Sequence, residues 1–182
     1  MNSSKKGSIK ALFPRGLIAN GADVLLAPVS MEGLCPLEIY WEMGKVTQIR
    51  VAEDCNDFPL KLLIPRLVEP HAHIDKAFTW ERFPNLNGNY ADALEANLRE
   101  HKVRTPQKVY SRAERALNLA FKNGLRSIRT HIDIFEPTAD QNWQVLNDLR
   151  LKWRDLIHLQ CVALAPMESW SSEAGAFLAS NV

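Results

Sequence analysis

Cysteine is scarce in this sequence, and its scarcity argues against a disulfide framework. The 182 residues include three cysteines, Cys35, Cys55 and Cys161, which is an odd number without paired spacing. Such usage is typical of a reducing compartment, so we expect a cytoplasmic location. Cys161 stands within an apolar run and is expected to be a small buried side chain.

A charge excess and long apolar runs are missing as well. The net charge is +1, so we expect neither a nucleic acid nor an anionic membrane surface as partner. No run approaches the roughly 18 apolar residues that a membrane span needs, and the short run before Pro14 contains Lys10 and is too polar for a secretory signal. What remains is an ordinary globular composition, 46% hydrophobic and 24% charged, with length for one or two domains.

One stretch, residues 62–76, joins an apolar run to a pair of histidines. Side chains alternate across a strand, so His71 and His73 are expected to point to the same face, with Glu69 one step behind them. Neutral imidazole is the commonest protein ligand for zinc, iron and related ions, which predicts a metal site here. The alternative is that the pair arose by chance on a solvated strand edge, where it would bind nothing.

The first 60 residues are expected to form a small β layer. Residues 1–10 are polar and are expected to be frayed. A hairpin is predicted around Gly44, which can adopt positive φ. Extended runs occur at residues 17–18, 22–26, 37–41 and 46–51.

After the histidine pair the pattern predicts alternating helices and strands. Helices are predicted at residues 90–101, 106–122 and 139–153, and strands near residues 62–69, 125–134 and 156–165. This alternation predicts βα units and a parallel sheet, either a barrel or a doubly wound layer. A closed (β/α)8 barrel takes about 250 residues, so the chain is expected to be the N-terminal part of a longer protein. The charged residues between 95 and 115, Glu100 and Arg104 among them, are expected to form a solvated helix surface.

Three segments carry a resemblance, in one order along the chain. They are Val68–Lys76 with its His-x-His pair, Arg129–Asp133, and Leu159–Ala163. They resemble the amidohydrolase superfamily, in particular its cytosine deaminase-like branch, and the hairpin around Gly44 resembles that family's N-terminal β-sandwich subdomain. The resemblance implies an α/β fold in which a β-sandwich-like layer, residues 1–60, precedes the first three βα units of a TIM-type (β/α)8 barrel, residues 61–182, with the barrel incomplete in this chain.

The resemblance also implies a metal-dependent hydrolase of carbon–nitrogen bonds. His71 and His73 would bind one divalent ion, iron or zinc, and water activated by the ion would attack a nitrogen heterocycle such as a pyrimidine or an aminotriazine. A third His ligand, a catalytic Glu and His, and a metal-binding Asp come from later strands in this family, so the catalytic residues are expected beyond residue 182. Met167 follows Pro166 where cytosine deaminases have a Gln that reads the pyrimidine edge, which puts cytosine itself in doubt.

Three more residues are candidates for the substrate pocket or for support of the metal ligands. Lys76 is either a contact to a substrate anion or carbonyl, or a solvated lysine. His131 is either a partner of the metal site or a hydrogen-bonded core histidine. Asp75 is one of the carboxylates, with Glu69 and Asp133, that could complete a makeshift site beside the two histidines.

A second hypothesis belongs to a different class of protein. The chain would be a non-catalytic N-terminal fragment that folds or acts only when a partner chain carrying the rest of the barrel joins it. A second chain or a homo-oligomer is the expected protein partner. In both hypotheses the small-molecule partner is a heterocyclic substrate. The two hypotheses differ in where the remaining metal ligands come from.

Overall fold

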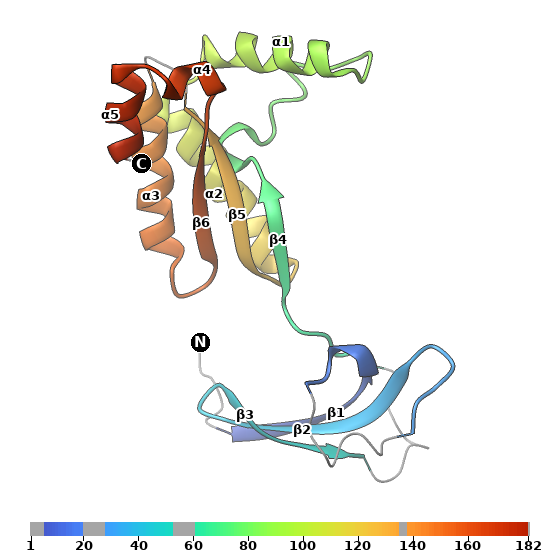
Figure 1. Cartoon of the computed structure of the whole chain (residues 1–182). Coiled ribbons are helices and arrows are strands. Elements are labelled where there is room, and N and C mark those ends of the chain that lie inside the picture. The colour runs from blue at the N-terminus through green and yellow to red at the C-terminus, as the bar shows by residue number, and fades with distance from the viewer. Residues whose placement is uncertain (1–5, 20–27, 53–60, 135–137, 182) are drawn as a thin grey trace. The chain divides into compact units, whose positions relative to one another are not determined.

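The structure is a computed structural model that describes residues 6–19, 28–52, 61–134 and 138–181. The chain divides into two compact units, Met1–Pro65 and Arg66–Val182. Each unit contains one three-stranded sheet, and the helices belong mainly to the second (Figure 1). The mixed α/β prediction is therefore confirmed. The run at residues 22–26 and Cys55 lie outside the described residues.

The first unit is built on an antiparallel sheet of order β1-β2-β3. Its strands are β1 (Lys6–Pro14), β2 (Leu34–Glu42) and β3 (Lys45–Val51), and the short 3-10 helix η1 (Arg15–Leu17) follows β1. The β2–β3 hairpin turns through Met43 and Gly44, with φ of 50° and 77°. Positive φ at both central residues is the pattern of a type I′ turn, whose twist matches that of the flanking strands. The hairpin around Gly44 is thus confirmed.

The prediction that residues 1–10 are frayed is wrong from Lys6 onward, because this segment is the first half of β1. Lys6 pairs with Glu42 and Lys10 with Glu38 on β2. The lysines alternate with less exposed residues, which is the two-residue period of a half-buried strand. The polar composition of the segment made this period hard to recognise. Gly7 suits this place, since a Cβ there would lie 2.5 Å from the Trp41 ring.

The second unit is built on a parallel sheet of order β4-β5-β6. Its strands are β4 (Leu67–Ala72), β5 (Leu125–Asp133) and β6 (His158–Leu164). Its helices are η3 (Ile74–Lys76), α1 (Tyr90–His101), α2 (Pro106–Lys122), α3 (Ala139–Trp153), α4 (Met167–Trp170) and α5 (Glu173–Asn181). Helices α1, α2 and α3 lie where the sequence predicted them. Among the described residues, no helix has the length and apolar character needed to cross a membrane.

Helix α2 anchors the core of this unit. Thr105 accepts a hydrogen bond from the Lys108 amide at 3.3 Å, which caps the helix. Val109, Ala113 and Leu117, spaced four residues apart, are fully buried. They pack in one apolar cluster with the inner faces of α3 and β5.

Leu117→Ala is expected to lower the free energy of unfolding by about 2–5 kcal/mol, because it removes buried methyl groups and leaves a cavity. Leu119→Ala is the matched control, since Leu119 lies on the same helix and is 43% exposed. Urea unfolding followed by circular dichroism would measure both. Equal losses in the two variants would contradict the burial of α2 described here.

Strand β4 differs from its prediction in two ways. It begins at Leu67 rather than near residue 62, and it runs on through His71. It is also an edge strand paired only with β5 within the described sheet, and Leu67 and Val68 are 51% and 65% exposed. Parallel strands are usually covered on both sides, and an edge strand without a second neighbour leaves apolar side chains exposed.

Cys161 is only partly buried, not fully as expected. It packs at the margin of the core cluster from β6. Burial, opposed by the charge of Arg150, raises the pKa of its thiol to about 11. The thiol is therefore protonated near neutral pH and has little nucleophilic character.

Candidate functional site

Three histidines meet near the carboxyl ends of β4 and β5. His71 belongs to β4, His73 follows it directly, and His131 lies on β5. The Nε2 atoms of His71 and His73 are 3.3 Å apart. The His131 ring stacks on that of His71, with centroids 4.0 Å apart. His71 and His73 thus point toward the same place, as expected for side chains two residues apart in an extended segment.

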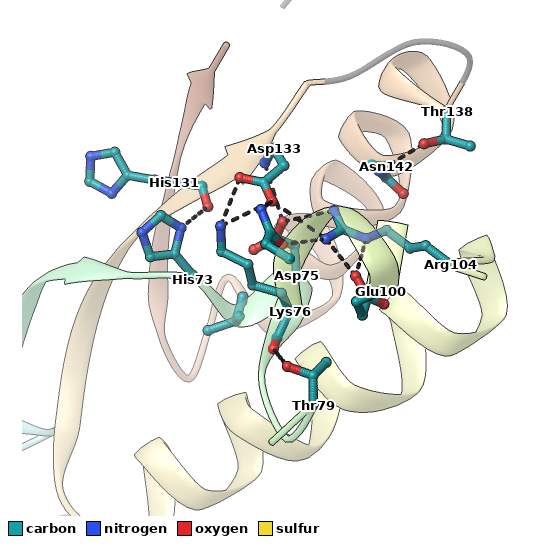
Figure 2. A network of polar contacts seen from close by, with 12 residues as sticks. His73, Asp75, Lys76, Thr79, Glu100, Arg104, His131, Asp133, Thr138 and Asn142 are labelled. Atoms are coloured by element: carbon teal, nitrogen blue, oxygen red, sulfur yellow. Dashed lines mark hydrogen bonds and ion pairs between the residues drawn. The ribbon is translucent and has the colours of Figure 1, made fainter. Parts of the chain in front are cut away.

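The orientation of His73 is set by a backbone group. Its Nδ1 lies 3.0 Å from the carbonyl oxygen of His131, a contact drawn in Figure 2. Because a carbonyl can only accept, Nδ1 carries the proton and donates, which leaves the Nε2 lone pair of the neutral ring free. Burial, aided by the charge of Lys76, lowers the pKa of His73 and favours this neutral form.

The two imidazoles fit part of a metal site. Two nitrogen ligands on one tetrahedral zinc ion lie about 3.3 Å apart, since each Zn–N bond is about 2.0–2.1 Å long, and the Nε2 atoms of His71 and His73 have this separation. The buried Nδ1 of His131 has no hydrogen-bond partner within the described part of the chain. Within the part of the chain that the structure describes, no three or more His, Cys, Asp or Glu side chains are placed together to hold an ion. The geometry therefore fits two ligands of an ion.

Beside the histidines lies a buried network of charges, shown in Figure 2. Lys76 Nζ donates to both carboxylate oxygens of Asp133, at 2.8 and 3.0 Å. Arg104 contacts Asp75 Oδ2 and Asp133 Oδ2, each at 3.4 Å. Asn97 Nδ2 donates to Asp133 at 2.9 Å. Both aspartates are therefore paired with Lys76 or Arg104. Among the described residues, neither aspartate forms a metal site with the histidines, so the makeshift site is not present.

The environments of the two aspartates move their pKa values in opposite directions. Burial, and next the charge of Asp133, raises the pKa of Asp75 to about 6. Burial would also raise the pKa of Asp133, but the hydrogen bond and charge of Lys76 prevail and lower it. Asp133 is thus the firmly ionised member of the network.

A cavity of about 640 Å³ opens at this end of the sheet. His73, Lys76 and Asp133 provide polar groups on its lining, and α1 provides an apolar wall. The lining also includes Phe83, Asn85 and the segment 164–166 that follows β6. Its size suits a small ring compound, since ligand pockets span about 300–1,000 Å³. Asp75 is 0% exposed and lies beneath this lining rather than on it.

Comparison with known proteins places this architecture in a family. The chain is 33% identical over 152 residues to a pterin deaminase of Rhizobium rhizogenes, a match that covers 80% of the chain. It is 28% identical over 109 residues to an N-isopropylammelide isopropyl amidohydrolase of Pseudomonas sp.. The chain belongs to the amidohydrolase superfamily.

A solved structure supports the fold of this amidohydrolase-superfamily chain. The 5-methylcytosine deaminase of Klebsiella pneumoniae superposes with a TM-score of 0.63 over 86% of the chain, at 23% identity. The chain spans 35% and 27% of the lengths of the two relatives above and 36% of this structure. No protein-family model matches the chain.

The part of the site that the sequence did not reveal comes from α1 and the corner after it. Glu100 and Arg104 were expected on a solvated surface, but they are only 3% and 5% exposed. The expectation was wrong because Arg104 is paired with Asp75 and Asp133, which are distant in sequence, and Glu100 is buried between Arg104 and Arg112. A Glu-to-Arg spacing of four on a helix was the only local signal, and it is equally common on exposed faces.

Proposed function

We propose that this chain is the metal-binding portion of an enzyme that hydrolyses a carbon–nitrogen bond on a nitrogen heterocycle. The observation that supports it most is the convergence of His71 Nε2 and His73 Nε2, 3.3 Å apart, beside a cavity of about 640 Å³. The relatives are named as a deaminase and an amidohydrolase, which favours this reaction class.

In this proposal His71 and His73 hold one divalent ion, iron or zinc. When bound, the ion supplies Lewis-acid activation of water for the hydrolysis. The protein keeps His73 neutral and aimed through the hydrogen bond of Nδ1 to the His131 carbonyl. His131 also supports His71 by ring stacking.

Lys76 is proposed to contact the substrate. Two of its three N–H donors go to Asp133, which also neutralises its charge. The third N–H would donate to a carbonyl or ring-nitrogen acceptor in the cavity, because Lys76 lines it. Asp75 supports this arrangement from below by accepting from the Asp133 amide at 3.2 Å.

For the substrate we favour a pterin or an aminotriazine over cytosine. The pterin deaminase and the N-isopropylammelide hydrolase support this preference. Met167 follows the cavity residue Pro166 and is 81% exposed. Its side chain lacks the amide with which a Gln would hydrogen-bond to the edge of a pyrimidine.

A second candidate is that the barrel and the metal site are completed by another chain. Two observations favour it: the chain spans 27–36% of the three proteins compared above, and the edge strand β4 exposes Leu67 and Val68. In that case the chain alone would bind metal weakly and would not turn over substrate.

Ammonia release distinguishes the two candidates. The chain, loaded with Fe²⁺ or Zn²⁺, would be assayed on pterin, cytosine and an aminotriazine, alone and with the part of the Rhizobium rhizogenes pterin deaminase that lies beyond the matched region. Activity of the chain alone would show that its own residues suffice for catalysis, against the expectation that the catalytic residues lie beyond residue 182, and it would exclude the second candidate. Activity only in the mixture is the result that the second candidate requires. Absence of activity in both, with metal bound, would overturn the proposed reaction class. His73→Ala is the negative control.

A further inference from the structure

Helix α1 forms a wall of the cavity with little apolar anchorage of its own. Figure 1 shows it lying across the ends of β4, β5 and β6. Tyr90, Ala93 and Leu94 line the cavity, yet Tyr90 is 82% exposed and Leu94 is 41% exposed. Ala96 and Glu100 are its buried residues. Apolar burial therefore contributes little to holding α1 against the strands.

Polar contacts supply the anchorage instead: Asn97 donates directly to Asp133 at 2.9 Å, and Arg104 makes the other links to the strand ends. It lies in the corner between α1 and α2, and its side chain is 0% exposed. Towards α1, it donates to Glu100 Oε2 at 2.7 Å and to Asn97 Oδ1 at 3.3 Å. Towards the strand ends, it contacts Asp75 and Asp133, each at 3.4 Å. One guanidinium group thus joins α1 to η3, which follows β4, and to the last residue of β5 (Figure 2).

We propose that Arg104 is a positioning residue that holds α1 over the cavity by bridging Glu100 and Asn97 to Asp75 and Asp133. The inference rests on the proposed function only in treating the cavity as a substrate pocket. In this role Arg104 favours the position of α1 that the structure shows.

The chemistry of arginine suits this role. A guanidinium group has five N–H donors in a fixed plane, so it can serve several acceptors on different elements at once. A lysine has three donors on one atom and cannot span the same acceptors. Glu100 is itself held from its other side by Arg112, at 2.6 Å, which fixes the acceptor that Arg104 uses on α1.

Hydrogen exchange measured by mass spectrometry tests this inference without metal or turnover, so it is independent of the proposed reaction. In Arg104→Lys, the amides of α1 are expected to exchange about tenfold faster or more, since charged hydrogen bonds are lost. The amides of α2 and β5 are expected to stay within about twofold of the parent. Glu100→Gln, which keeps an acceptor but removes its charge, should show the same pattern more weakly.

The matched control is Glu95→Gln. Glu95 lies on the same helix and pairs with Arg99 in solvent, where its side chain is 70% exposed. This variant is expected to leave α1 exchange unchanged. Acetylation of Lys76, relative to Lys45, the exposed first residue of β3, is a second measurement, and it should rise in Arg104→Lys as α1 loosens.

Two results would overturn the proposal. If α1, α2 and β5 all exchange faster by the same factor, Arg104 supports only the stability of the whole unit. If α1 exchange and Lys76 acetylation are unchanged, α1 does not depend on Arg104. Should Arg104→Lys fail to fold, Glu100→Gln decides on the same two measurements.

Discussion

Replacing His71 and His73 together with alanine is expected to abolish metal binding by this chain. We expect near-stoichiometric iron or zinc in the parent and a loss of affinity of at least about a hundredfold in the variant. Loss of a group that merely orients a ligand already costs about 10–100-fold in affinity, and here both ligands themselves are removed. Elemental analysis after gel filtration, with a competitive zinc titration, would measure the change.

His158→Ala is the matched control for this experiment. His158 is exposed at the first position of β6, away from the ends of the strands where the histidine pair lies. Its removal is expected to leave the metal content unchanged, and circular dichroism would verify that all three proteins are folded. Undiminished metal in the double variant would contradict the proposed site.

The histidine pair could be predicted from the sequence because its geometry is local. Two residues of separation in an extended chain put side chains on one side, and this holds for His71, on β4, and His73, directly after it. Helix α2 could be predicted for a similar reason, since Thr105 caps it and its apolar residues recur every four positions. Period and capping are properties of adjacent residues.

The network around Arg104 could not be predicted, because it depends on contacts between distant segments. Arg104 is 29 residues from both Asp75 and Asp133 in sequence, and Lys76 is 57 residues from Asp133. Only the fold brings these charges together. A charged residue on a helix is more often solvated, so the local pattern favoured the wrong surroundings for Arg104 and Glu100.

For Asp133 the sequence predicted the position near the histidines but not the hydrogen-bond partners, for the same reason. Strand spacing after His131 placed it near the histidines, which suggested a metal ligand. In the structure Lys76, Asn97 and Arg104 all donate to it, and it is 1% exposed. Its carboxylate is therefore the common acceptor of the network, with a structural importance that its sequence position did not indicate.

Asp133→Ala is accordingly expected to lower the free energy of unfolding by about 3 kcal/mol. Breaking a buried ion pair costs about 3–5 kcal/mol, because the remaining partner is left as an uncompensated charge. We expect the lower end, since the Lys76 side chain is 23% exposed and can turn to water, and Arg104 keeps Asp75 and Glu100. Urea unfolding followed by circular dichroism would measure the loss.

Asp155→Ala is the control that separates burial from charge. It also removes one negative charge, but the Asp155 side chain is 90% exposed and its nearest cation, Arg154, is 4.0 Å away. Its free energy of unfolding should stay within about 0.5 kcal/mol of the parent. An equally small loss in the free energy of unfolding for Asp133→Ala would contradict this prediction. It would mean that the cost of desolvating the carboxylate cancels its interactions with Lys76, Asn97 and Arg104. The network would then position residues without stabilising the fold.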